Sequence, residues 1–419
     1  MLNLKKSILL IGARYFFVLL PFVISIFIAN VGGEELLGKY YLYISVITCL
    51  AIFLKGGVDI LSLREASRLL YQPIEYNRLC ITSAYSLFII SVAVGILFFY
   101  AFNFLSQQFQ LKEVAEWLFF FFGGIGIAIV STISSFFKAK QKQFLAIILE
   151  IVTIPLLFLI VYSIYVYASK PEIFAKIYGL CSIFVAAIAA TFFVMKTKFY
   201  IPVTKNIISF IRLAIPIFLV ALITFLINNL SVFLIAKMSS LEDLGVFQFS
   251  FRLVVFITSL NIILSSIYSP KFSKLYSDGN IADLEKLSKE FAAIGFVLTS
   301  IMLIALNLFQ EPFLNIFLDD FRNINNLILI FSFGYLLVSF IGPVGFMLTM
   351  TNHEVEHLGS KICSLILILF SMPYLINIFG IEGAAMSLTG SIILLNLLNA
   401  IIVRYRLGFW IYPSFRPFL

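Results

Sequence analysis

Three basic side chains lie inside stretches of the sequence that are otherwise apolar. Arg14 is about two turns into the first stretch, Lys55 is in the second, and Arg252 is about two turns into the eighth. A charge at the centre of a membrane helix costs about 3 kcal/mol on insertion scales, which disfavours a position facing lipid. Two interpretations remain open. The three cations line a polar cavity and bind an anion there, or their side chains snorkel to the nearest headgroups.

Two carboxylates in the same apolar surroundings are candidates for binding a proton or Na⁺. Asp59 follows Lys55 by four residues, a spacing that also allows a neutralising pair on one helix face. Glu150 is about two turns into the fifth stretch, with no acid or base nearby in the sequence. An unpaired carboxylate in a place of low dielectric tends to take up a proton. The alternative for Glu150 is an ion pair with a neighbouring span.

Amide side chains interrupt three of the apolar stretches. Asn228 and Asn229 lie in the seventh, Asn261 in the eighth, and Asn396 and Asn399 in the twelfth. Amides can bond sugar hydroxyls across a cleft, and they also bond neighbouring helices. We take Asn228 and Asn261 as candidate substrate ligands beside Arg14, Lys55 and Arg252.

The sequence does not favour a metal, a nucleotide or an enzyme. His353 and His357 are four residues apart beside Glu354 and Glu356, but this order differs from the HExxH of zinc proteases. There is no phosphate-binding P-loop and no nucleophile constellation. We therefore expect no catalytic residues, no metal site and no cofactor beyond a coupling proton or Na⁺.

The elements that must position these side chains are about twelve apolar stretches of roughly 20 residues each, the length at which a helix crosses a bilayer. The chain is 62% hydrophobic and 12% charged, whereas soluble proteins are about 25% charged. This predicts an all-α polytopic membrane protein. The spans are expected near 7–29, 38–61, 79–101, 115–137, 144–167, 173–195, 210–236, 245–267, 291–310, 325–350, 358–377 and 382–403.

Lys and Arg favour every second loop, which sets the expected orientation. Lys5 and Lys6 precede the first span, and the same side receives the basic cluster Lys138, Lys140 and Lys142. The opposite loops collect acids instead. By the positive-inside rule both termini are cytoplasmic. The net charge of +8 then reflects topology and attraction to anionic lipid, and we expect no nucleic-acid binding.

The chain repeats itself with a shift of 207 residues. Glu35, Leu37 and Gly38 then fall on Glu242, Leu244 and Gly245. Each half holds six spans, so both halves enter the membrane in the same direction, as in a parallel repeat. We expect lobes at 1–206 and 207–419, with six helices each, around a central cleft suited to alternating access.

Several motifs in the second half resemble one transporter family. They are the inner loop PKFSKLY at 270–276, followed by DGN at 278–280 and LEKL at 284–287, then Gly342-Pro343, and FGIEGAA at 379–385. The pattern is similar to that of the polysaccharide-transport branch of the multidrug/oligosaccharidyl-lipid/polysaccharide (MOP) exporter superfamily, the Wzx-type flippases.

The resemblance implies a function and a set of partners. Wzx-type flippases move undecaprenyl-pyrophosphate-linked oligosaccharide from the cytoplasmic to the outer leaflet for O-antigen or capsule assembly. The resemblance also implies a location in the bacterial inner membrane, and a polysaccharide polymerase and a chain-length regulator as partners. Related flippases carry cavity cations on spans 1, 2 and 8, which matches Arg14, Lys55 and Arg252 by span. Arg suits a diphosphate because its planar fork donates two hydrogen bonds at once.

Three alternatives remain open from the sequence. Two are transporters: a lipid II flippase, which usually has two further C-terminal spans, and a cation-coupled drug antiporter of the MATE type. An antiporter is favoured by acids outnumbering cations in the cleft, and here the cations outnumber the acids. The third is a membrane polymerase or ligase of surface polysaccharide, which needs a larger outer loop than any in this chain.

Overall fold

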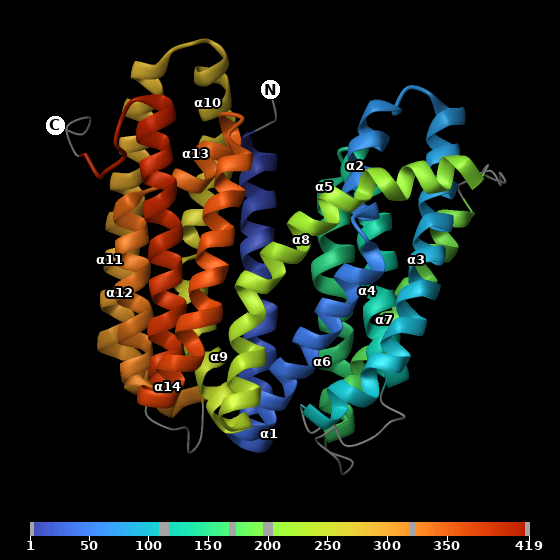
Figure 1. Ribbon diagram of the computed structural model, residues 1–419, viewed down its shortest axis with the longest axis horizontal. Helices are drawn as coiled ribbons and strands as arrows, with labels where there is room; N and C mark the ends of the chain where they lie inside the picture. Colours follow the sequence, from blue (N-terminus) through green and yellow to red (C-terminus); the bar gives the residue numbers. More distant parts are fainter. Residues whose placement is uncertain (1–3, 109–116, 167–172, 196–203, 318–323, 415–419) are drawn as a thin grey trace. The chain divides into compact units, whose positions relative to one another are not determined.

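The computed structural model describes residues 4–108, 117–166, 173–195, 204–317 and 324–414. Within these ranges the regular structure is helical, with no strand. The helices of the first half are α1 (Leu4–Lys55), α2 (Val58–Arg68), α3 (Pro73–Gln108), α4 (Trp117–Ala139), α5 (Gln143–Ile147), the π-helix η2 (Ile148–Val152), α6 (Thr153–Val166) and α7 (Phe174–Val194). Those of the second half are α8 (Thr204–Met238), α9 (Leu241–Thr258), α10 (Leu260–Ser277), α11 (Ile281–Phe317), α12 (Asn325–Ile341), α13 (Val344–Met350) and α14 (Glu354–Leu407) (Figure 1).

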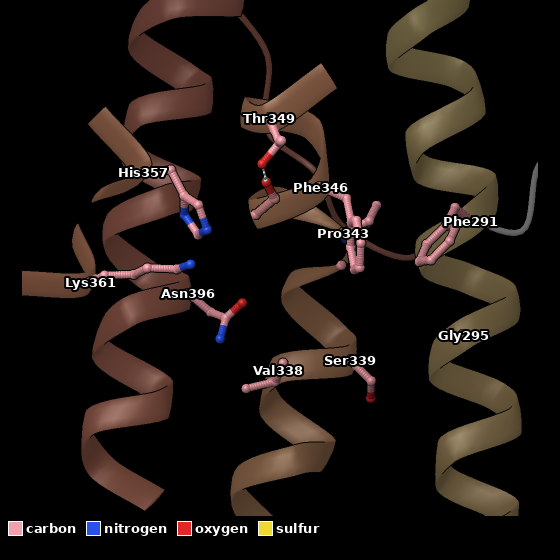
Figure 2. Close-up of a pocket in the computed structure, with 12 residues that line it drawn as sticks. Phe291, Gly295, Val338, Ser339, Pro343, Phe346, Thr349, His357, Lys361 and Asn396 are labelled. Atoms are coloured by element: carbon pink, nitrogen blue, oxygen red, sulfur yellow. Dashed lines mark hydrogen bonds between the residues drawn. The ribbon is translucent and has the colours of Figure 1, made fainter. Parts of the chain in front are cut away.

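Eight of the twelve predicted spans fall on a single helix each. The spans at 38–61, 144–167, 245–267 and 325–350 are each made of two or three consecutive helices. Eight helices of the described residues are long and apolar enough to cross a membrane, and the α12–α13 pair, bent by 44°, makes a ninth. This pair is interrupted at Gly342-Pro343 (Figure 2). The chain is therefore an all-α, multi-pass membrane protein, as predicted.

The structure replaces two of the predicted loops with short breaks at glycine. Both α1 and α14 consist of two helices merged across a kink, at Gly32-Gly33 in α1 and at Gly380 in α14. Gly33 and Gly380 have φ of 68° and 59°, a region that glycine enters without steric cost. A glycine thus turns the chain within one or two residues, and helical hydrogen bonding resumes at once.

The two largest predicted loops are also mostly helical. The loop expected at 62–78 contains the end of α2 and the start of α3, and that at 268–290 contains the end of α10 and the start of α11. The spans predicted at 79–101 and 291–310 are therefore the central parts of helices 36 and 37 residues long. Hydropathy marks the apolar part of a helix and not its polar extension beyond the membrane.

The chain forms two compact units. Unit 1 comprises residues 1–24 and 39–225, and unit 2 comprises residues 25–38 and 226–419. In unit 1, α4 packs against α7 and α2, and in unit 2, α12 packs against α11 and α14 (Figure 1). The units divide the chain differently from the predicted lobes at 1–206 and 207–419, because 25–38 lies in unit 2 and 207–225 lies in unit 1.

The order of helices follows the repeat. With a shift of 207 residues α3 falls on α11, α4 on the α12–α13 pair, and α7 on the part of α14 that follows Gly380. The shift aligns Gly38 with Gly245. Within unit 2, each of these glycines lies against the chain segment that precedes the other glycine. A Cβ on Gly38 would lie 1.8 Å from the carbonyl oxygen of Leu241, and a Cβ on Gly245 would lie 2.1 Å from that of Glu34. Since Glu34 and Leu241 are also 207 residues apart, the contact is reciprocal.

Candidate functional site

A break between α1 and α2 positions the first two polar residues of the site in unit 1. Gly56 and Gly57 have φ of 51° and 79°, which ends α1 at Lys55 and starts α2 at Val58. Lys55 Nζ lies 3.2 Å from Asp59 Oδ2, and their side chains are only 22% and 11% exposed. The predicted neutralising pair is therefore present, although the helix is interrupted between its two members.

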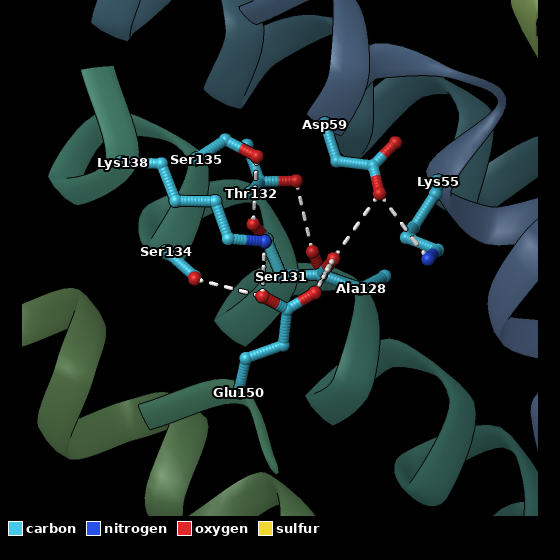
Figure 3. A network of polar contacts seen from close by, with 9 residues as sticks. All are labelled: Lys55, Asp59, Ala128, Ser131, Thr132, Ser134, Ser135, Lys138 and Glu150. Carbon is cyan, nitrogen blue, oxygen red and sulfur yellow. Dashed lines mark hydrogen bonds and ion pairs between the residues drawn. The ribbon is translucent and has the colours of Figure 1, made fainter. Parts of the chain in front are cut away.

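A row of hydroxyls on α4 faces this pair. Ser131 Oγ lies 3.1 Å from Asp59 Oδ2 and 3.4 Å from Glu150 Oε1 (Figure 3). A serine hydroxyl has one hydrogen to donate, so Ser131 donates to one carboxylate at a time. Ser134 Oγ donates to the other oxygen of Glu150 at 2.9 Å.

Glu150 is held by a local irregularity in its helix. It lies in the π-helix η2, between α5 and α6, and its carboxylate pairs with Lys138 from α4. Short π-helical turns inside α-helices occur frequently at functional sites. The structure thus gives Glu150 the ion pair with a neighbouring span that the sequence left as an alternative. Its role in coupling stays a prediction.

Together these residues form one polar network inside unit 1. The network contains two cations, Lys55 and Lys138, and two acids, Asp59 and Glu150, linked through Ser131 (Figure 3). Its formal charge is balanced, which lowers the cost of placing four ionised groups among apolar helices.

Two of the other predicted site residues lie outside this network, in unit 2. Arg252 is half-buried on α9 and Asn228 is exposed on α8, both in unit 2. Arg14 lies on α1 and Asn261 on α10, but their side chains are outside the described part of the structure. Of the predicted residues, the structure therefore brings together Lys55, Asp59 and Glu150.

Sequence reasoning missed the residues of α4 that join the two pairs. The sequence predicts Lys138 in a cytoplasmic loop, whereas in the structure it lies in the last turn of α4. Ser131, Ser134 and Lys138 follow one another by three and four residues, the spacing of one helix face. That spacing in an apolar helix was a usable signal for a buried polar face.

The two histidines have separate partners. His353 Nδ1 lies 3.1 Å from Thr351 Oγ1, and His357 Nδ1 lies 3.1 Å from Asn399 Oδ1. Among the residues that the structure describes, no group of three or more His, Cys, Asp or Glu side chains could hold a metal ion.

Several solved structures share this fold. An inward-facing multidrug resistance MATE family transporter of the MOP superfamily is 15% identical over 94% of each chain, with a TM-score of 0.76. The lipid II flippase MurJ, in an inward closed conformation, is 15% identical over 95% of this chain and 87% of its own, with a TM-score of 0.70. A MOP superfamily transporter from Pyrococcus furiosus is 14% identical over 96% of each chain, with a TM-score of 0.62.

These likenesses establish the fold, which is that of the MOP transporters. The search of curated protein sequences gave no match. A protein family described as "Polysaccharide biosynthesis protein" matches residues 3–276, more than half of the chain. The chain belongs to this polysaccharide biosynthesis family.

Proposed function

We propose that this protein is a flippase for undecaprenyl-pyrophosphate-linked oligosaccharide. It moves the substrate from the cytoplasmic to the outer leaflet of the bacterial inner membrane by alternating access, and both of its termini are cytoplasmic. The glycan serves O-antigen or capsule assembly. The observation that carries the proposal is the combination of a polysaccharide biosynthesis family with the fold of a transporter.

Charge supports an anionic substrate. The two acids of the network in unit 1 are each paired with a lysine, so this site has no net negative charge to attract a cationic drug. Arg252 of unit 2 is a half-buried cation on α9. A guanidinium in this setting suits a diphosphate, which it can bind with two parallel hydrogen bonds.

We also propose that the network couples transport to a proton or Na⁺. Ser131 lies within reach of both Asp59 and Glu150. Protonation of one carboxylate weakens its hold on the nearby lysine and on Ser131 and favours the other pair. A change of charge at one acid is in this way transmitted to the other helix.

The test is a flipping assay with the purified full chain in liposomes. Undecaprenyl-pyrophosphate-linked oligosaccharide is placed in both leaflets, and a glycosidase added outside cleaves the accessible glycan. A flippase raises cleavage from about half of the glycan to nearly all of it, and protein-free liposomes stay at half. Cleavage that stays at half with folded protein present contradicts the proposal.

The same liposomes separate the alternatives. Lipid II and a cationic dye are tested in place of the oligosaccharide. Transport of lipid II alone identifies a lipid II flippase, and uptake of the dye alone identifies an antiporter. Longer glycans formed without any change in accessibility identify a polymerase.

A further inference from the structure

The repeat places a different set of residues in unit 2 where unit 1 has its polar network. A shift of 207 residues carries Glu150 to His357 and Lys138 to Gly345. An acid and its lysine are thus replaced by an imidazole and a residue without a side chain. At this place a cavity of about 430 Å³ is found, lined by His357 and Gly345 among others (Figure 2).

The cavity has a polar side and an apolar side. His357, Lys361 and Asn396 of α14 line the first, and the second is formed by rings from α11, from α13 and from the residue before α13, which are Phe291, Phe346 and Pro343 (Figure 2). Its volume lies within the range of about 300–1,000 Å³ that is typical of small-molecule sites.

Lys361 gives the cavity a positive charge that is not neutralised. It is half-buried, and no carboxylate pairs with it in the described ranges of the chain. Glu356, five residues before it, pairs with Arg406 at 2.6 Å. In unit 1 each half-buried lysine of the network pairs with an acid. Lys361 of unit 2 therefore differs from them in having no such partner among the described residues.

The amide and imidazole groups add hydrogen-bond acceptors. Asn399 Oδ1 accepts from His357 Nδ1, which leaves Nε2 of the neutral ring as an acceptor. Asn396 Nδ2 donates to the carbonyl oxygen of Ile392 at 2.8 Å, which leaves its Oδ1 as an acceptor. A Cβ on Gly345 would lie only 3.2 Å from His357 Cε1, so glycine leaves this side of the ring clear.

We propose that this cavity binds a sugar ring that carries one oxyanion. The oxyanion bonds Lys361, the sugar hydroxyls donate to His357 and Asn396, and a face of the ring lies against Phe291 and Phe346. The oxyanion is a phosphate at the lipid linkage or the carboxylate of an acidic sugar. The identification of this ring as part of the transported glycan rests on the proposed function.

The experiment measures binding to the purified full chain in detergent by isothermal titration calorimetry. The probes are glucose 1-phosphate, glucuronic acid and glucose. We expect at least one of the two anionic probes to bind more tightly than glucose. Binding of glucose 1-phosphate alone identifies the phosphate as the source, and binding of glucuronic acid alone identifies the carboxylate.

Variants of two lysines decide whether the cavity is the site. Lys361→Gln should weaken binding of the anionic probe about tenfold or more, the value of a charge-assisted hydrogen bond, and leave glucose unchanged. Lys361→Arg retains the charge and should bind, which also reports folding. Lys274→Gln removes the same charge from an exposed position on α10 in the same unit and should have no effect.

Two results would overturn the inference. One is equal affinity of Lys361→Gln and wild type for the anion, and the other is no binding of any probe at millimolar concentration. Neither result affects the flipping assay. If flipping of the lipid-linked glycan is absent while binding depends on Lys361, the proposed function fails and the site remains.

Discussion

Ser131 is the residue on which the polar network of unit 1 depends. Its single hydroxyl hydrogen can satisfy Asp59 or Glu150, and the distances of 3.1 and 3.4 Å leave both bonds within reach. The two acids lie on different helices, α2 and η2. Ser131 Oγ therefore connects the two acids across these helices.

A double-mutant cycle on Glu150 and Lys138 tests the pair that the structure shows. Glu150→Gln or Lys138→Gln alone leaves one charge without its partner and should lower stability by about 1–2 kcal/mol, less than for a fully buried pair because both side chains are about one-third exposed. The double variant removes both charges and should be nearer to wild type. Thermal unfolding in detergent measures the effect, and additive losses would contradict the pair.

The same variants distinguish a structural role from coupling. If Glu150 only stabilises, the folded double variant flips substrate at the wild-type rate across an imposed pH gradient. If Glu150 carries a proton, the double variant loses the response to the gradient although it is folded. We expect loss of the response, because the network can exchange partners.

Arg252 should be required for surface polysaccharide. Arg252→Ala removes a half-buried cation from α9 and should abolish the polymer, with the protein still in the membrane. Arg252→Lys should restore the surface polymer only partly, because an ammonium group lacks the planar, two-pronged hydrogen-bonding geometry of a guanidinium. The same substitutions at Arg14 should have the same result. Full polymer in both alanine variants, at normal protein level, would exclude these residues from the substrate path.

The sequence allowed half of the network to be predicted. Lys55 and Asp59 are four residues apart, and this spacing placed them together even though the helix breaks between them. Glu150 and Lys138 are on different helices, so their pairing depends on how α4 packs against η2, which no local spacing determines. His357 is predictable from the sequence only as one of two histidines, and it corresponds to Glu150 only through the 207-residue repeat.

At the scale of elements, the two glycines between α1 and α2 set the geometry of the site. Gly57 has φ of 79°, and a Cβ there would lie 2.5 Å from the carbonyl oxygen of Ala214 on α8. The break therefore allows α8 to approach closely and directs Asp59 toward α4.

Gly57→Ala should destabilise the protein more than Gly279→Ala. Gly279 has a similar φ of 72°, but no atom lies within 4 Å of a Cβ placed there. The control thus carries only the backbone strain, about 1–2 kcal/mol, and Gly57→Ala adds a clash with backbone that cannot move freely. The melting temperatures of the two variants in the same detergent measure the effect. An equal decrease for both would mean that α8 moves away and relieves the clash.

The existence of the helices could be predicted better than their ends. The thickness of the bilayer fixes the length of an apolar span, so each predicted span fell on helical structure, although four spans are interrupted by a break or a π-helix. The kinks at Gly32-Gly33 and Gly380 were predicted as loops, because hydropathy cannot separate a short loop from a turn made by glycine. No motif in the sequence predicted the π-helix around Glu150.

At the scale of the whole molecule, the alternation of Lys and Arg predicts which loops are cytoplasmic. A reporter fused after Lys142 should read cytoplasmic, and a reporter fused after Lys170 should read outside. The helical segment from Gln143 to Val166 lies between the two positions. Alkaline phosphatase and green fluorescent protein fusions measure this, and the same compartment for both would mean that this segment does not cross the membrane.

The reciprocal glycine contact has a consequence for the origin of the chain. Gly38 meets the carbonyl of Leu241 as Gly245 meets the carbonyl of Glu34. In an ancestor of half this length, Gly38 and Gly245 would be the same residue, and so would Glu34 and Leu241. One glycine–carbonyl contact would then occur twice across the two-fold interface of a homodimer. A single substitution in that gene would have changed both contacts together. Fusion of two such copies would free the halves to diverge, which is consistent with a balanced set of charges at Glu150 in one half and a cavity at His357 in the other.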